Sequence, residues 1–244
     1  MNDGIRNIMV IHEEEALLLR AKVPYFDKRT NKQYKAGQKW LIKGPIDFIP
    51  ENEVDVIEKR QFQPLAENEG LYVRDLWSGQ VKLVKGPQTY LLNEYEELWN
   101  KDLTPDVEQL LALNSAGIDY IPSQGDGKGG ITYQYKQASI RTKKYLAVGY
   151  KAPHNSAVLL FDYKNKKSRI VFGPELIMLE PYEEFTMITL SGGAPKLENQ
   201  IKTLSLLLGP DFMTDVIQVE TSDHAKLYLR LSYRWNFKID KNNE

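Results

Sequence analysis

Clusters of acidic side chains are the residues of this chain whose spacing first suggests catalytic chemistry. They occur at Glu13, Glu14 and Glu15, at Glu94, Glu96 and Glu97, and at Glu183 and Glu184. Two neighbouring carboxyl groups can divide the tasks of general acid and general base. The clusters recur in similar surroundings, however, whereas an active site is expected once. We therefore expect solvated strand ends or ion pairs between subunits.

A glycine-rich stretch, GDGKGG from Gly125 to Gly130, has the composition of a ligand-binding loop. A Walker loop needs Ser or Thr directly after its lysine, but Lys128 is followed by Gly129. A calcium loop needs further oxygen ligands two and four residues beyond Asp126, and the sequence has none there. We therefore expect a mobile loop rather than a phosphate or calcium site.

The usual nucleophiles and metal ligands are poorly represented. The chain contains no cysteine, and no serine lies in a Gly-x-Ser-x-Gly setting. The three histidines, His12, His154 and His224, have no metal-ligand spacing, so structural or surface roles are expected for them. The sequence predicts no enzyme, no catalytic residue, no cofactor and no metal site.

Aromatic side chains could instead form stacking platforms for bases or sugars. The chain has 14 tyrosines and four tryptophans, Trp40, Trp77, Trp99 and Trp235. Three of the tryptophans lie within or beside apolar segments that recur along the chain, where such residues usually fill a core or an interface. We expect core or subunit-interface positions for them.

Composition adds few limits. The 244 residues are 42% hydrophobic and 27% charged, which is typical of a globular chain, and the net charge of −1 gives no sign of a nucleic-acid or anionic-membrane surface. The first twenty residues contain no apolar segment long enough for a signal peptide or a membrane span. We expect a soluble cytoplasmic chain without a membrane anchor.

The elements that position these residues are marked by a recurring Gly-Pro pair. It occurs in WLIKGPIDFIP at Gly44, in KLVKGPQTYLL at Gly86, in RIVFGPELIML at Gly173 and in SLLLGPDFMTD at Gly209. Apolar residues precede and follow each pair. A second element is rich in Leu, Val and Tyr. It lies upstream of the first three pairs as ALLLRA, GLYVRD and AVLLFDY, which begin at Ala16, Gly70 and Ala157, and a similar string, AKLYLRL at Ala225, follows the fourth pair.

The spacing of these elements predicts β-hairpins. Fifteen residues separate Leu71 from Gly86, and fifteen separate Val158 from Gly173, with turn residues between them in both cases. The repeat unit is then an antiparallel β module of roughly 50 to 60 residues, which has a marginal core when alone and gains from stacked neighbours.

The Gly-Pro pairs are predicted to be structural turn residues of the repeat. Proline cannot donate to a sheet ladder, and glycine tolerates a positive φ, so each pair should mark a bend between two strands. Gly86→Val is therefore predicted to destabilise its repeat through a strained positive φ. The predicted turn residues are Gly44, Pro45, Gly86, Pro87, Gly173, Pro174, Gly209 and Pro210.

One segment interrupts the repeat pattern with a predicted helix. In LTPDVEQLLALNSAG, Thr104 suits the N-cap, Pro105 the first helical position and Asp106 the positive end of the helix dipole. Leucines and Val107 at helical spacing share one face, and Gly117 can end the helix. The predicted fold class is mainly β: tandem small antiparallel sheets in an elongated array, with one short inserted helix and a glycine-rich loop.

Several strings together resemble the major vault protein family. They are AGQKWLIKGPIDFIPENEVDVIEKRQ, PLAENEGLYVRD, APHNSAVLLFDYKNKKSRIVFGPEL and LLLGPDFMTDVIQVETSDHAKLYLRLSYRWNF, in this order. The resemblance implies vault-type β repeats at residues 1–57, at 58–142 with the insertion at about 100–142, and at 143–208. It also implies the start of a shoulder domain similar to stomatin and prohibitin at 209–244.

The same resemblance implies a structural subunit, or a fragment of one, of the vault ribonucleoprotein particle in the cytoplasm, with a minor nuclear fraction. Its β repeats would form the side wall of a hollow barrel by lateral self-association and scaffold signalling or transport cargo. The implied partners are copies of the chain itself, the vault poly(ADP-ribose) polymerase, the telomerase-associated protein and vault RNA, without direct nucleic-acid binding by these residues.

Two other functions are compatible with the sequence. The first is a standalone β-repeat module that binds a protein or a glycan through its aromatic and acidic surface. The second, suggested by the shoulder resemblance, is a membrane-band scaffold, which usually requires a membrane anchor that this sequence does not display.

Overall fold

A computed structural model describes residues 8–115, 117, 120–122, 141–193 and 195–238. These residues form 23 strands and one α-helix, and every paired strand runs antiparallel to its partner. The chain divides into two compact units, one of residues 1–100 with 145–147 and one of residues 101–144 with 148–244.

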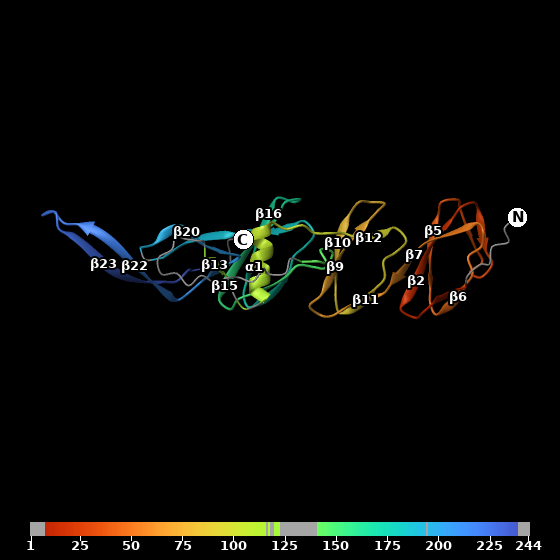
Figure 1. Cartoon of the computed structure of the whole chain (residues 1–244), viewed down its shortest axis with the longest axis horizontal. Helices are drawn as coiled ribbons and strands as arrows, with labels where there is room; N and C mark the ends of the chain where they lie inside the picture. The colour runs from red at the N-terminus through yellow and green to blue at the C-terminus, as the bar shows by residue number, and fades with distance from the viewer. Residues whose placement is uncertain (1–7, 116, 118–119, 123–140, 194, 239–244) are drawn as a thin grey trace. The chain divides into compact units, whose positions relative to one another are not determined.

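The first unit begins with a repeat built on a three-stranded sheet whose central strand is β2 (Figure 1). A two-stranded sheet and a hairpin complete the repeat. The strands of the main sheet are β5 (Lys39–Lys43), β2 (Glu15–Ala21) and β7 (Val54–Gln61); the others are β1 (Met9–Ile11) with β6 (Ile46–Phe48), and β3 (Tyr25–Asp27) with β4 (Lys32–Tyr34).

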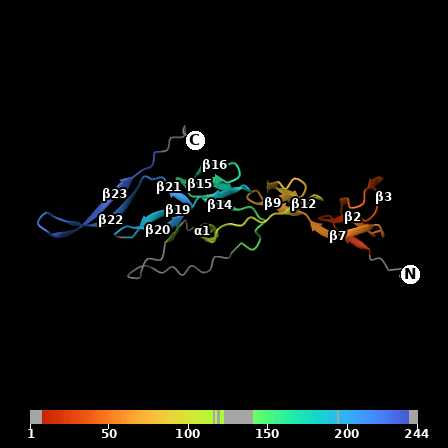
Figure 2. The same ribbon diagram turned by 90° about the horizontal axis from the view of Figure 1, so that it is seen from above.

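The second repeat of this unit has the same arrangement without the extra hairpin. Its main sheet has the order β10–β9–β12, and a separate two-stranded sheet pairs β11 with β8. Seen from above, β9 and β12 lie together, apart from β2 and β7 (Figure 2). The bounds are β8 (Gln63–Leu65), β9 (Gly70–Asp75), β10 (Val81–Lys85), β11 (Gln88–Tyr90) and β12 (Glu96–Leu98).

The second unit contains the third repeat. Its central strand β15 pairs with β16 on one side and with β18 and β21 along the other, and β14 pairs with β17 in a separate sheet. The bounds are β14 (Gly149–Ala152), β15 (Ser156–Asp162), β16 (Lys167–Phe172), β17 (Glu175–Met178), β18 (Glu183–Phe185) and β21 (Ser205–Leu207).

The same strand pairing therefore occurs three times, which confirms the predicted mainly β fold of tandem antiparallel sheets. In each repeat the register places a residue of the central strand opposite the last residue before the Gly-Pro pair: Ala16 faces Lys43, Gly70 faces Lys85 and Ala157 faces Phe172. Apolar residues of the central strands, mainly Leu and Val, form the small cores. The recurring segments rich in Leu and Val predict such strands.

The inserted segment forms the predicted helix α1 (Pro105–Ser115). Val107, Leu110 and Leu111 are buried on one face, and Gly117 follows the helix with φ of 80°. Next to it, β20 (Leu197–Thr203) pairs with β13 (Tyr120–Pro122) and β19 (Ile188–Gly192). The predicted glycine-rich loop, residues 125–130, lies outside the described residues.

The chain ends in a two-stranded hairpin of β22 (Asp211–Glu220) and β23 (Lys226–Trp235). One face of this ribbon carries Met213, Ile217, Leu229 and Tyr233, all exposed. Among the described residues, no helix has the length and hydropathy needed to cross a lipid bilayer.

Candidate functional site: the Gly-Pro bends and carboxylate turns

The four predicted Gly-Pro pairs each occupy a break between two consecutive strands, and all four Gly-Pro peptide bonds are cis. Gly44-Pro45 separates β5 from β6, Gly86-Pro87 separates β10 from β11, Gly173-Pro174 separates β16 from β17, and Gly209-Pro210 separates β21 from β22. In the three repeats the chain leaves the main sheet at this bend and enters the two-stranded sheet. The geometry agrees with a turn role, which we retain as a proposal for these eight residues.

The reason for glycine at the first three bends differs from the expected one. Gly44, Gly86 and Gly173 do not have a positive φ, so the predicted backbone strain at Gly86 is wrong. A Cβ atom added at Gly86 would instead lie 1.9 Å from the carbonyl oxygen of Ala66. The corresponding distances are 2.0 Å at Gly44 and 1.8 Å at Gly173. Close approach of two backbone segments therefore requires glycine at these bends.

Only the fourth bend uses the left-handed region of backbone space. Gly209 has φ of 83°, and a Cβ atom there would lie 2.8 Å from the carbonyl oxygen of Trp235. Gly209 thus combines a positive φ with a close backbone approach. The fourth Gly-Pro pair resembles the others in sequence but not in backbone conformation.

The acidic clusters lie in tight turns that precede strands. In the first repeat, the Glu15 amide donates to the carbonyl of His12 at 3.1 Å, and the Glu15 carboxylate accepts from the His12 amide at 2.9 Å. Ala66 and Glu69 repeat both bonds at 3.0 Å in the second repeat. A side chain that bonds a nearby amide in this way stabilises the turn, because it satisfies a donor that strand pairing leaves open.

A second set of carboxylate turns precedes the third strand of the main sheet. Asn93 and Glu96 exchange the same two bonds at 3.1 and 3.0 Å, and Glu180 and Glu183 do so at 3.1 Å each. Glu96 is 5% exposed and Glu183 is 7% exposed. The expectation that the acidic clusters are solvated strand ends is therefore wrong for these two residues.

The Glu96 carboxylate is compensated by neighbours from its own repeat. Lys82 Nζ lies 2.6 Å from Oε1, and the Tyr90 hydroxyl donates to Oε2 at 2.7 Å. Burial acts to raise the pKa of Glu96, but the bonds from the Asn93 amide, Lys82 and Tyr90 outweigh it, so the pKa lies below its ordinary value. Glu96 is thus an ionised structural group.

Glu183 is compensated by an arginine in the third repeat. Arg169 binds the carboxylate in bidentate fashion, with Nε at 2.7 Å and Nη2 at 2.9 Å. Burial again acts to raise the pKa of Glu183, and the bonds from Arg169 and the Glu180 amide lower it below the ordinary value. Both buried acids form ion pairs inside one chain, which replaces the expected pairing between subunits.

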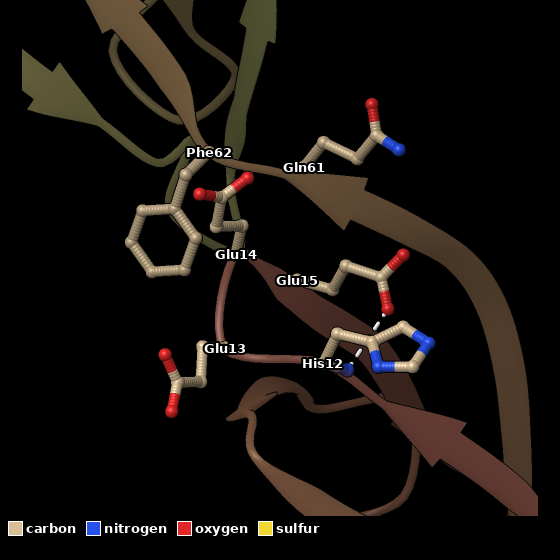
Figure 3. A pocket seen from close by; sticks show the side chains of 6 residues that line it. All are labelled: His12, Glu13, Glu14, Glu15, Gln61 and Phe62. Atoms are coloured by element: carbon tan, nitrogen blue, oxygen red, sulfur yellow. Dashed lines mark hydrogen bonds between the residues drawn. The ribbon is translucent and has the colours of Figure 1, made fainter.

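A cavity lies at the first acidic cluster. It has a volume of about 530 Å³ and is lined by His12, Glu13, Glu14, Glu15, Gln61 and Phe62. Glu15 points toward the His12 amide, whereas Glu13 points to the other side (Figure 3). The Glu15 carboxylate also pairs with Lys59 at 2.6 Å. The described residues contain no group of His, Asp and Glu arranged to hold a metal ion.

The histidines and tryptophans occupy dissimilar environments. His154 is exposed, and His224 lies in the β22–β23 turn with Nδ1 2.9 Å from a Glu220 carboxylate oxygen. Trp40 is buried and stacks on Tyr34 at a ring-centroid distance of 4.1 Å, which confirms a core position for it.

Trp77 does not occupy a core. It is 77% exposed and contacts the Tyr95 ring edge-on at 5.2 Å. Trp99 and Trp235 make similar edge-on contacts with Tyr72 and Phe237. Sequence alone could not separate Trp40 from Trp77, because both lie in or beside strands.

Tandem antiparallel β modules with this bend and turn chemistry define a β-repeat protein. The chain matches family models described as Major Vault Protein repeat domains at residues 9–51, 62–123 and 147–208, and a shoulder-domain model at residues 209–244. The chain belongs to the major vault protein family. The matched ranges fall inside the repeat boundaries predicted from the sequence, and those boundaries remain predictions.

Individual relatives agree with this assignment. The chain is 48% identical over 237 residues to the major vault protein alpha of Dictyostelium discoideum, 45% identical over 238 residues to the major vault protein of Bos taurus, and 43% identical over 242 residues to that of Homo sapiens. These alignments cover 97 to 98% of the chain but 26% of each relative. The chain spans about a quarter of the length of the curated relatives it matches.

Proposed function

We propose that this chain is a structural subunit, or a piece of one, of a vault particle, and that its repeats associate side by side with those of identical copies. The observation that carries the proposal is a segregation of charge between the two edges of the repeat sheets. Family membership supports the structural role, and the buried acids act in turns rather than in a catalytic pair.

One edge strand of each main sheet is basic. The strands β5, β10 and β16 contain six basic residues and no acidic one: Lys39, Lys43, Lys82, Lys85, Lys167 and Arg169. Lys43, Lys85 and Lys167 are exposed. These strands lie at the outside of their sheets, so one side of their backbone faces away from the central strand, and the exposed lysines lie along this edge. Lys82 and Arg169 instead pair with acids of their own sheets.

The opposite edge is acidic in the second and third repeats. There β12 contains Glu96 and Glu97, and β18 contains Glu183 and Glu184, without a basic residue. In the first repeat β7 carries both signs. A basic edge that meets the acidic edge of the next copy forms a head-to-tail contact, and such contacts can close into a ring. This arrangement is the basis for a barrel wall.

Charge reversal on one edge at a time tests the proposal. One variant carries Lys85→Glu and Lys167→Glu, and the other carries Glu97→Lys and Glu184→Lys. Sedimentation velocity at about 50 mM salt, where exposed charges are weakly screened, measures association. We expect the wild-type chain to associate, each variant alone to remain monomeric, and an equimolar mixture of the two variants to associate again.

A matched control carries the same charge change away from the edges. Lys28→Glu with Lys32→Glu alters two exposed lysines of the β3–β4 hairpin and should associate like the wild type. A wild-type chain that stays monomeric at low and high salt would contradict lateral association. Association of either variant alone would contradict the head-to-tail pairing of opposite edges.

The remaining family properties belong to the same proposal. They are a cytoplasmic location with a minor nuclear fraction, a non-enzymatic role, and a particle that also contains the vault poly(ADP-ribose) polymerase, the telomerase-associated protein and vault RNA. A scaffold for signalling or transport cargo is a further part of it. The near-neutral charge of the chain supports contact with protein partners rather than with RNA.

A protein- or glycan-binding module is the second candidate, and the exposed Trp77 favours it. Trp77 lies 77% exposed with its ring against Tyr95 and offers an aromatic anchor for a partner. A pull-down with the 244-residue chain should then capture a partner that Trp77→Ala releases and that the edge variants retain. Retention of all partners by Trp77→Ala would eliminate this candidate.

A further inference from the structure

A partly buried arginine at the end of the first repeat, Arg60, reaches into a turn of the second. Arg60 Nη1 donates to the carbonyl of Leu92 at 3.1 Å and also to the carbonyl of Asn93. Its side chain is only 10% exposed, and its Nε pairs with Glu58 at 2.6 Å. The guanidinium therefore binds the carbonyl oxygens of the same turn that Glu96 closes from the amide side.

A lysine in the second unit makes the corresponding contact. Lys101 Nζ donates to the carbonyl of Pro181 at 2.7 Å, and Lys101 is 2% exposed. Pro181 belongs to the turn from Glu180 to Glu183, in which the Glu183 carboxylate binds the Glu180 amide. Again a carboxylate holds the amide of a turn while a cation from an earlier segment holds a carbonyl.

The two cations stand at similar positions in their repeats. Arg60 lies six residues beyond Val54, and one of these residues, Ile57, is skipped in the pairing of β7 with β2. Lys101 lies five residues beyond Glu96, the first residue of β12. Val54 and Glu96 both end the turn that begins the third strand of a main sheet. Arg60 lies near the end of β7, still paired with Ala16, whereas Lys101 lies three residues beyond the end of β12.

The turn of the first repeat lacks this combination. Val54 occupies the position of the closing carboxylate, although its amide still bonds the Glu51 carbonyl at 3.1 Å. The cation near this turn is Lys22, which comes from the same repeat and donates to the Asn52 carbonyl at 3.3 Å. Among the three turns that precede the third strand of a main sheet, the carboxylate and the cation from a preceding segment therefore occur together in the second and third repeats.

We propose that Arg60 and Lys101 are positioning residues, each of which anchors the segment leaving one repeat sheet to the carboxylate turn of the following repeat. Carbonyl oxygens that are buried without a donor are costly, so each turn favours the arrangement in which the cation is seated. The anchoring is independent of the lateral association proposed above, because both contacts lie within one chain and neither cation is among the residues changed in the edge variants.

Hydrogen exchange of the full 244-residue chain, read by mass spectrometry, tests the anchors. Arg60→Met and Lys101→Met keep the length of the side chain and remove its donors. We expect amides of residues 90–98 to exchange about tenfold faster in Arg60→Met, and those of residues 178–186 to do so in Lys101→Met. Each variant should leave the other turn unchanged, and Arg60→Lys should restore part of the protection.

Neighbouring exposed lysines provide the controls. Lys59→Met removes the pair with Glu15, and Lys144→Met removes the pair with Asp102, so each deletes a charge beside an anchor without deleting the anchor. Wild-type exchange at the turns in both Met variants, or equal acceleration in the controls, would overturn the proposal. If Lys101→Met does not fold, Arg60→Met and Arg60→Lys decide the outcome.

Discussion

The first repeat and the two that follow it build the same sheet from different chemistry. In the first repeat the third strand of the main sheet begins at Val54, which belongs to a core of ten buried apolar and aromatic residues. The second repeat places Glu96 at that position, beside a core cluster of only four buried residues. Glu96 and Glu183, each in a charged pair, thus stand at the position where the first repeat buries Val54. A repeat can keep its pairing while its stabilising interactions change type.

The bends that the repeats share should be the most sensitive positions. Gly86→Ala places a Cβ atom at 1.9 Å from the Ala66 carbonyl oxygen, which forces the two segments apart. We expect a loss of about 4 kcal/mol or more, in the range of exceptional single substitutions. Thermal unfolding and hydrogen exchange of the second repeat measure the loss.

Gly79→Ala is the matched control for that change. Gly79 has φ of 69° and no atom within 4 Å of an added Cβ, so only backbone strain of about 1 to 2 kcal/mol is expected. Equal losses of stability from the two substitutions would show that the close approach of the Ala66 carbonyl is not the reason for glycine at position 86.

Removal of the aromatic core should affect the first repeat alone. Trp40→Ala deletes a buried ring stacked on Tyr34 and should cost about 3 to 4 kcal/mol. Trp77→Ala deletes an exposed ring and should cost less than about 1 kcal/mol. Chemical denaturation followed by hydrogen exchange distinguishes the two repeats. A comparable loss from both variants would contradict the division between apolar and charged repeats.

The charged repeats should respond to alkaline pH through Lys101. Burial lowers the pKa of Lys101 to about 8, although Glu184 and Glu183 act to raise it; the nearby Arg141 lowers it further. The unfolded lysine keeps its ordinary pKa of 10.5, so the unfolded chain binds the extra proton between pH 8 and 10.5. Stability attributable to Lys101 therefore rises with pH in this window, by at most about 3 kcal/mol.

The wild type and Lys101→Met must be compared to isolate this contribution, because other lysines and tyrosines titrate in the same range. The difference in unfolding free energy between the two proteins, measured at pH 7.5 and pH 9.5, should move in favour of the wild type at the higher pH. A constant difference would show that Lys101 does not titrate in this window.

The smallest effect is expected at the carboxylate of the second repeat. Glu96→Gln keeps the shape but weakens the bonds from Lys82 and the Asn93 amide, at a cost of about 1 to 2 kcal/mol near neutral pH. Because folding lowers the pKa of Glu96, its contribution is present above the unfolded pKa and is lost as pH falls through the folded pKa. The cost should therefore shrink in acid.

Glu97→Gln serves as the control in the same strand. Glu97 pairs with Arg74 while its side chain is 41% exposed, so a change of less than about 0.5 kcal/mol is expected. Equal costs for Glu96→Gln and Glu97→Gln, or a cost for Glu96→Gln that does not depend on pH, would contradict a structural role of the buried carboxylate.

Much of this fold could be predicted from spacing within the sequence. The distances from Leu71 to Gly86 and from Val158 to Gly173 correspond to the hairpins β9–β10 and β15–β16, because a tight turn fixes the register of the strands it joins. The helix after Thr104 was also predictable, since its start signals and apolar face are local.

The turn and anchor chemistry could not be predicted in the same way. The carbonyl of Ala66 that requires Gly86 to lack a side chain comes from a segment 20 residues earlier. Lys101 and Pro181 are separated by 80 residues. Such contacts depend on how sheets pack, and hydropathy patterns do not encode them. The sequence did contain one signal for the carboxylate turns, which is a glutamate three residues after the first residue of the turn. This spacing occurs at Glu15, Glu69, Glu96 and Glu183.

The aromatic stack in the first repeat also gives the chain an intrinsic optical reporter. Indole emission shifts to longer wavelength when the ring becomes hydrated. Trp40 is buried and stacks on Tyr25 and Tyr34, whereas Trp77 is in contact with solvent. When Trp77, Trp99 and Trp235 are all replaced by Phe, Trp40 is the one indole left in the chain. A red shift and easier quenching by acrylamide would then follow the opening of the first repeat. That repeat can therefore be observed spectroscopically without an added dye.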